Sequence, residues 1–279
     1  MKKRLISISV GLVFLFAVML WIDTFFLNIA FLLLGGLAIF EAARALKLND
    51  SAVYVILFWI AHTLNMLFAL NLFYFVFVLL FAVFCAVMFF DKKGHSFKQV
   101  AAAYCMTFFI TFGLRSIVIM RGISTDVPDM RFMLFIALGL GWICDTLAFT
   151  FGNLFGKRKL CPAISPGKTI AGAVGGVLGT PIIIVIIFYI YSIKANSTSL
   201  FYGQNAPVQL AYYFALGLVG AIVGIIGDLA ASFIKRECGI KDYGNVMPGH
   251  GGALDRLDSV LCTSVLAAGA FELFFKLFN

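Results

Sequence analysis

The sequence predicts an all-α membrane protein, a polytopic bundle of about nine transmembrane helices with its N-terminus in the cytoplasm. Of the 279 residues, 62% are hydrophobic and 12% are charged, whereas about 25% of the residues in a soluble domain are charged. The mean hydropathy is +1.04, and several apolar segments reach the roughly 20 residues that cross a bilayer as a helix. A single soluble domain is excluded, because so few charges cannot cover a water-facing surface.

The predicted spans follow one another along the whole chain. We place them at residues 5–21, 25–41, 52–68, 71–90, 100–118, 132–151, 170–193, 209–234 and 258–277. The first span follows three basic residues, as a signal peptide does, but no small-x-small cleavage site comes after it. We therefore expect it to be retained as the first helix. Only a very short connection near Asn71 separates the third and fourth spans.

The distribution of basic residues predicts the orientation of the chain. With nine spans, 16 of the 21 lysines and arginines fall on the side that holds the N-terminus, and the positive-inside rule assigns that side to the cytoplasm. The formal net charge of +8 is then explained by anionic lipid head groups, and we expect no nucleic-acid partner. The six cysteines form no CxxC pair and are expected to be small buried hydrophobic residues.

The two halves of the chain differ in the polarity of their spans. Residues 1–131 carry few polar groups there and are predicted to form a transmembrane scaffold. Residues 132–279 concentrate Asp, Lys, Arg, Gly and Pro in the segments 141–172 and 224–259. We predict that this second region is catalytic, with its site on the cytoplasmic side, and that both regions form one integral membrane unit.

Asp228 is the first candidate site residue. It lies inside an apolar span, where an ionised carboxylate is costly unless it is paired or bound to a metal ion. Helical spacing puts Ser232, Lys235 and Arg236 on the same face, at i+4, i+7 and i+8. This stripe leads from an acid within the membrane to a basic pair at its edge, although a simple salt bridge at a helix end leaves a similar pattern.

A glycine-rich segment follows that stripe. It contains Lys241-Asp242, then Pro248-Gly249-His250-Gly251-Gly252, and it ends in Asp255-Arg256-Leu257-Asp258. Three glycines and a proline within five residues predict a tight, irregular backbone whose N–H groups can bind phosphate. Asp255 and Asp258 share a face if a helix begins there, where acids also complement the helix dipole. We expect His250 to contact phosphate rather than to act as a base.

A third segment begins at Asp145, a second acid within a span, and continues through a basic loop to Ser165-Pro166-Gly167-Lys168-Thr169. The last three residues imitate the end of a Walker A loop. However, Pro162 stands where that motif has its first glycine, and no hydrophobic strand precedes it. A P-loop is therefore rejected. The basic loop is expected to bind a substrate phosphate or, alternatively, only lipid head groups.

Carboxylates beside lysines and arginines favour the chemistry of Mg²⁺ and phosphates. Mg²⁺ takes hard oxygen ligands, usually one or two carboxylates together with substrate phosphates. Two metal ions can clamp both sides of an in-line displacement at phosphorus. We expect such a two-metal site, in which the second ion is either Mg²⁺ or a monovalent cation. The basic side chains would neutralise the triphosphate and the leaving pyrophosphate.

The run of 27 residues from Ser232 to Asp258 resembles the signature of the phosphatidate cytidylyltransferases, the CDP-diacylglycerol synthases. The segment from Asp145 to Thr169 resembles the second characteristic stretch of that family. The resemblance covers about residues 140–279, whereas the first half matches only in hydrophobicity and length. The family usually continues after the threonine with an aromatic residue, Glu or Gln, and Gly, where this chain has Ile170-Ala171-Gly172.

The resemblance implies a Mg²⁺-dependent reaction of CTP with phosphatidic acid that gives CDP-diacylglycerol and pyrophosphate, performed by a nine-helix homodimer among membrane lipids. It implies metal binding by Asp228 and Asp255, with Asp258 close by, and we nominate all three as metal ligands. The motifs and the resemblance together nominate as catalytic residues Asp228, Lys235, Arg236, Lys241, Asp242, His250, Asp255, Arg256 and Asp258. They nominate as substrate-binding residues Asp145, Ser165, Lys168, Thr169, Ser232, Gly249, Gly251 and Gly252.

Two other classes of function stay open from the sequence. An ion-coupled transporter can use intramembrane acids such as Asp145 and Asp228, although no clear inverted repeat is visible. A lipid kinase or a transferase for another nucleotide is the second alternative, because the residues do not specify the base. The short chain favours the plasma membrane of a bacterium, with the active site facing the cytoplasm.

Overall fold

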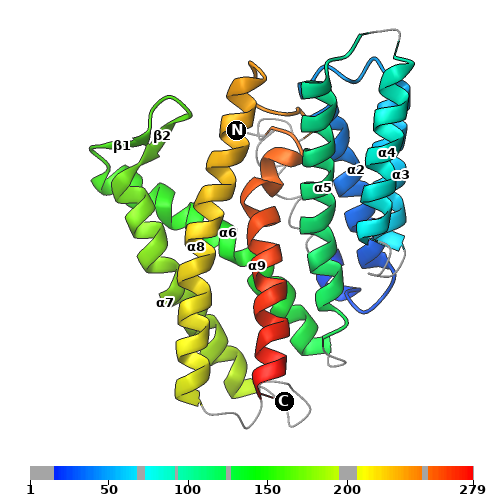
Figure 1. The fold of residues 1–279 in the computed structure, drawn as a ribbon. Helices are drawn as coiled ribbons and strands as arrows, with labels where there is room; N and C mark the ends of the chain where they lie inside the picture. Colours follow the sequence, from blue (N-terminus) through cyan, green and yellow to red (C-terminus); the bar gives the residue numbers. More distant parts are fainter. Residues whose placement is uncertain are drawn as a thin grey trace. The chain divides into compact units, whose positions relative to one another are not determined.

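The computed structural model describes residues 16–67, 73–91, 94–123, 127–194, 206–246 and 251–278. Within these residues the fold is almost entirely helical, with one two-stranded hairpin (Figure 1). Six of the described helices are long and apolar enough to cross a membrane, and two shorter helices are also apolar. The prediction of an all-α, multi-pass integral membrane protein is confirmed, while the cytoplasmic N-terminus stays a prediction.

The chain divides into two compact units. Unit 1 comprises Met1–Val118 and Glu237–Leu257, and unit 2 comprises Ile119–Arg236 and Asp258–Asn279. The described helices of unit 1 are α2 (Phe26–Ala45), α3 (Ala52–Leu67), α4 (Phe73–Phe89) and most of α5 (Phe97–Met120). Unit 2 holds α6 (Val127–Phe155), α7 (Ile170–Lys194), nearly all of α8 (Ala206–Glu237) and most of α9 (Leu254–Phe278). The assignment of residues 1–131 to a scaffold and of residues 132–279 to a catalytic region is a statement about function, and it stays a prediction.

The helices agree with eight of the predicted spans, and the third and fourth spans are indeed separate helices. Of the first predicted span, residues 16–20 are helical and the earlier residues lie outside the described part of the chain. One expectation was wrong. The basic segment before α7 was expected to be a loop, but it contains the antiparallel strands β1 (Lys159–Cys161) and β2 (Ser165–Thr169). Strands of three and five residues are too short to leave a recognisable hydrophobic alternation.

Glycines allow the helices of unit 2 to pack closely. A Cβ atom on Gly172 of α7 would overlap the carbonyl oxygen of Ala148 on α6, and it would lie 3.2 Å from Gly152 Cα. A Cβ atom on Gly141 of α6 would lie 2.8 Å from Ser259 Oγ on α9. Small residues of this kind let helix backbones approach within a membrane, where packing rather than the hydrophobic effect drives association. The close approach brings polar side chains of different helices within reach of one another.

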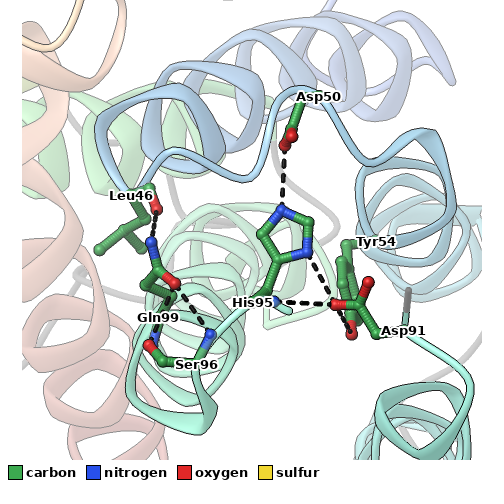
Figure 2. A network of polar contacts seen from close by, with 7 residues as sticks. All are labelled: Leu46, Asp50, Tyr54, Asp91, His95, Ser96 and Gln99. Atoms are coloured by element: carbon green, nitrogen blue, oxygen red, sulfur yellow. Dashed lines mark hydrogen bonds and ion pairs between the residues drawn. The ribbon is translucent and has the colours of Figure 1, made fainter. Parts of the chain in front are cut away.

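A polar network in unit 1 surrounds His95, in the loop between α4 and α5 (Figure 2). The Nδ1 atom of His95 lies 2.7 Å from Asp91 Oδ2, and its Nε2 atom lies 3.0 Å from Asp50 Oδ1. The Tyr54 hydroxyl also donates to Asp91 Oδ2, at 3.2 Å. Burial lowers the pKa of His95, but hydrogen bonds and charge from Asp91 and Asp50 outweigh it, so that the pKa lies above its ordinary value. The network ties the loop before α3 to the loop before α5.

We expect the stability of the protein to fall as the pH rises through the pKa of His95. A histidine whose pKa is raised on folding stabilises the fold fully below its unfolded pKa of about 6.5, and this contribution is lost above the folded pKa. Thermal unfolding in detergent should show a lower melting temperature on the alkaline side of this pKa. His95→Gln should flatten this dependence, whereas Lys276→Gln, in an exposed ion pair, should keep it. A steep alkaline loss that persists in His95→Gln would contradict the assignment.

Candidate active site

Three carboxylates of unit 2 come from three different helices. Asp145 lies on α6, Asp228 on α8 and Asp258 on α9. All three are half-buried, and Asp258 interacts electrostatically with both Asp228 and Asp145. Because carboxylates within membrane helices are costly without compensation, their partners decide what this cluster can do.

Two lysines compensate the negative charge. The Lys168 ammonium on β2 forms an ion pair with Asp228, and Lys235 Nζ lies 3.9 Å from Asp258 Oδ2. The four side chains are between 10% and 25% exposed, so solvent screens these pairs less than it screens pairs on an open surface. The cluster therefore brings three carboxyl groups and two lysine side chains together.

Hydroxyl groups orient the carboxylates. Ser232 Oγ donates to Asp228 Oδ1 at 3.4 Å, one helical turn away. The Ser259 hydroxyl donates to Asp145 Oδ2 at 3.1 Å, and its backbone N–H donates to Asp258 Oδ1 at 2.9 Å. Ser259 thus links the acids of α6 and α9, and each carboxylate has at least one oxygen held by a hydrogen bond.

The hairpin carries Lys168 to the cluster, and two contacts hold it in place. Arg236 Nε at the end of α8 donates to the Ile164 carbonyl in the hairpin turn at 3.2 Å. Thr169 Oγ1 accepts the N–H of Gly172 at 3.1 Å and so caps the first turn of α7. The position of Lys168 is therefore set by the ends of α7 and α8.

A cavity of about 440 Å³ opens beside Asp145, Lys168 and Asp228. A few converging polar groups within apolar walls are typical of small-molecule sites of this size, and they suit a ligand with a charged end and an apolar part. The lining residues come from α6, the hairpin, α7 and α8: Asp145, Ala148, Phe149, Gly152, Asn153, Leu160, Gly167, Lys168, Thr169, Gly172, Ala173, Ile225 and Asp228.

The glycine-rich segment and the first turn of α9 belong to unit 1. Asp255 Oδ2 accepts the N–H of Tyr243 at 2.8 Å and the N–H of Gly252 at 2.9 Å. Gly251 has a φ angle of +84°, which side chains with a Cβ atom rarely adopt. Asp255 therefore organises the backbone of this loop, in addition to the metal-binding role predicted for it.

The predicted site residues fall into two groups, one in each unit. Unit 2 contains Asp145, Ser165, Lys168, Thr169, Asp228, Ser232, Lys235, Arg236 and Asp258, which contribute to the acid cluster, the cavity or the hairpin. Unit 1 contains Lys241, Asp242, Gly251, Gly252, Asp255 and Arg256. Gly249 and His250 lie outside the described residues. The individual roles of all these residues stay predictions.

Ser259 and the apolar cavity wall were not predicted. Ser259 contacts two of the acids, and the signal for it is a hydroxyl directly after Asp258 in an otherwise apolar helix. Asn153, near the end of α6, also lines the cavity, and an amide side chain among phenylalanines is a comparable signal. Phe149 and Leu160 leave no such signal, because they do not differ from lipid-facing residues in the sequence.

The acid cluster of unit 2 offers carboxylate oxygens, the hard ligands that Mg²⁺ requires. No group of three or more His, Cys, Asp or Glu side chains in the described ranges is arranged to hold a metal ion. Mg²⁺, however, usually takes only one or two carboxylates and completes its shell with phosphates and water. The carboxylates of Asp228 and Asp258 are therefore a chemically suitable donor set, and the predicted Mg²⁺ stays a prediction.

The apolar helices and the charged cluster beside a cavity define a multi-pass integral membrane protein with an ionic site among its helices. The sequence matches the family model described as the cytidylyltransferase family over residues 2–274. The chain belongs to this family, and the resemblance seen in its motifs is thereby confirmed.

Individual relatives carry the name phosphatidate cytidylyltransferase. The protein of Staphylococcus haemolyticus is 33% identical over 171 residues, which cover 61% of this chain and 58% of that protein. The Staphylococcus aureus protein (strain COL) is 35% identical with the same coverage. The Haemophilus influenzae protein is 38% identical over 129 residues, 46% of this chain and 42% of the relative. The matched segments thus span about half the length of these relatives. The bacterial origin of the relatives and the six apolar helices support a multi-pass protein of the bacterial inner membrane.

Proposed function

We propose that the protein transfers a cytidylyl group from CTP to phosphatidic acid, giving CDP-diacylglycerol and pyrophosphate. An oxygen of the lipid phosphate forms a bond to the α-phosphorus of CTP. The bond between that phosphorus and the oxygen leading to the β-phosphorus breaks, and pyrophosphate leaves with the electron pair. Because a phosphate monoester is already ionised near neutral pH, the attacking group needs no strong base.

The observation that carries this proposal is the ion pair between Lys168 and Asp228 at the charged end of the cavity. A lysine beside a triphosphate neutralises charge as pyrophosphate leaves. The apolar wall next to it suits a lipid, whose phosphate stays near the charged residues. Family membership and the names of the relatives support the choice of CTP and phosphatidic acid.

The residues of unit 2 divide the work between anions and cations. Lys168, Lys235 and Arg236 would contact phosphates and orient the two substrates. Asp228 and Asp258 would hold Mg²⁺, which when bound supplies positive charge to the phosphates. Ser232 and Ser259 keep the carboxylates in a fixed orientation, so that these charges are preorganised before the substrates bind. The predicted homodimer and the cytoplasmic position of the site are proposals of the same standing.

Purified protein in detergent micelles should convert phosphatidic acid to CDP-diacylglycerol when CTP and Mg²⁺ are present. Product formation and pyrophosphate release are measured together, because the balanced reaction yields them in equal amounts. EDTA should abolish both, and ATP, GTP or UTP should not replace CTP.

Two results would change the proposal in different ways. If CDP-diacylglycerol forms at the same rate in EDTA, the proposed role of Mg²⁺ is wrong but the proposed reaction stands. Folded protein that yields no product with any nucleotide, yet moves an ion across sealed vesicles, would overturn the enzyme in favour of the transporter.

A further inference from the structure

Glu41, near the end of α2, is a buried acid whose partners come from far along the chain. Only 2% of its surface is exposed. Its Oε1 accepts the N–H of Ala253 at 3.1 Å, and its Oε2 accepts the N–H of Leu254 at 2.9 Å. All three residues belong to unit 1. One carboxylate of the first half thus holds the point where α9 begins.

The start of α9 needs such a partner. The first N–H groups of a helix have no acceptor within the helix, and Ser, Thr, Asp or Asn at the N-cap usually provides one. Here the helix begins at Leu254 and the residue before it is Ala253, whose side chain has no oxygen. Glu41 supplies two oxygens instead, and its negative charge faces the positive end of the helix dipole.

The loop backbone approaches Glu41 so closely that only glycine fits. A Cβ atom on either Gly244 or Gly252 would overlap the Glu41 carboxylate, and a Cβ atom on Gly244 would also lie 3.0 Å from Gly252 Cα. Two parts of the loop, one before and one after Met247–His250, are therefore packed against one buried side chain. This gives Gly244, which no motif singled out, a steric role.

Arg44 lies one turn further along α2 and holds the same loop at a second point. Its Nη2 donates to the Tyr243 carbonyl at 2.7 Å. The N–H of Tyr243 donates in turn to Asp255 Oδ2, which also accepts the N–H of Gly252. Two side chains of α2 and the carboxylate of Asp255 thus bind the same short stretches of backbone. The orientation of the Asp255 carboxylate therefore depends on the backbone positions that Glu41 and Arg44 of α2 fix.

We propose that Glu41 is a positioning residue for the site: it fixes the backbone of Gly252–Leu254 and so orients the carboxylate of Asp255. The inference rests on the proposed function and on the metal-binding role that the resemblance implies for Asp255. It assigns a specific task to the half of the chain that the sequence presented only as scaffold.

Glu41→Gln is the sharpest test, because it keeps the shape of the side chain but replaces one acceptor oxygen with an NH₂ group that faces a backbone N–H. Glu41→Asp keeps the charge but shortens the reach. Glu272→Gln is the matched control, since Glu272 is exposed and pairs with Lys276 on the same helix. Hydrogen–deuterium exchange of the Mg²⁺-free protein should be roughly tenfold faster or more in the peptide that contains Gly252–Leu254 in Glu41→Gln. The rest of the chain and the control should exchange as the wild type does.

Activity provides the second readout. The Mg²⁺ concentration for half-maximal turnover should rise about 10- to 100-fold in Glu41→Gln, the usual effect of removing a residue that orients a metal ligand. Excess Mg²⁺ should restore part of kcat, and Glu41→Asp should lie between the two. A variant that is merely less stable loses active protein but keeps the wild-type Mg²⁺ requirement.

Unchanged exchange around Gly252–Leu254 in Glu41→Gln would overturn the proposal, and so would an unchanged Mg²⁺ requirement in an active variant. If Glu41→Gln does not fold, Arg44→Gln removes the bond to the Tyr243 carbonyl and a positive charge that interacts with Glu41. It should speed exchange in the same peptide by a smaller factor, and no change there would be equally decisive. A wild type that forms no CDP-diacylglycerol, combined with the local exchange effect, would refute the proposed function while leaving the role of Glu41 in holding the loop.

Discussion

Asp228→Asn should reduce the transfer of the cytidylyl group by at least about 10²–10³-fold, the range typical for loss of one preorganised charged or polar group at a reacting centre. Asparagine has nearly the shape of aspartate, so the cavity should keep its form. The substitution removes the negative charge that pairs with Lys168, while the amide oxygen of asparagine can still accept the Ser232 hydroxyl. It also removes one of the proposed Mg²⁺ ligands. Initial rates at saturating CTP and phosphatidic acid, with protein confirmed as folded by size-exclusion chromatography, measure the effect.

A double-mutant cycle makes this prediction specific to the ion pair. Lys168→Gln alone should also lower turnover strongly. Because the two residues act on the same phosphates, the double variant should lose much less than the product of the two single losses. Asp23→Asn, at an exposed position, is the matched control and should leave turnover unchanged. Near-wild-type turnover in Asp228→Asn would contradict the proposed role of Asp228 in the reaction.

Local spacing made part of the site predictable. Ser232 is four residues after Asp228 on α8, and the hydrogen bond between them is what helical periodicity predicts. The contact of Lys168 with Asp228 joins the hairpin to α8, and the contact of Ser259 with Asp145 joins α9 to α6. No spacing rule predicts such contacts, because they depend on how closely the helices approach. The sequence therefore identified most residues of the cluster but not the pairs they form.

Glu41 shows a different reason why a site residue can be missed. Its partners are the backbone N–H groups of Ala253 and Leu254, and a backbone group has no side-chain signature. The only sequence signal is negative: α9 begins without an N-cap side chain of its own. Likewise the hydropathy pattern predicted the membrane helices well, because span length is set by the bilayer, but it could not predict the short hairpin that carries Lys168.

Gly172→Ala should destabilise the protein and lower its activity together, because this glycine is both a helix contact and part of the cavity wall. The added Cβ atom would overlap the Ala148 carbonyl oxygen and lie 3.0 Å from Thr169 Oγ1. Backbone cannot move aside as a flexible side chain can, so α7 must shift away from α6. Overpacking of this kind costs about 1–3 kcal/mol, which corresponds to a melting temperature lower by roughly 2–12 °C. Thermal unfolding in detergent and turnover at a permissive temperature measure the two effects.

Gly269→Ala separates steric overlap from the ordinary effect of glycine in a helix. Gly269 also lies within a helix, α9, but nothing lies within 4 Å of the position that its Cβ atom would take. Alanine has a higher helix propensity than glycine by up to about 1 kcal/mol, so this variant should be as stable as the wild type or more so. A melting temperature that falls in Gly172→Ala but not in Gly269→Ala would show that α6 and α7 pack closely. This close packing would then determine the positions of Asp145 and the hairpin. Equal melting temperatures for the two variants would contradict this close packing of α6 against α7.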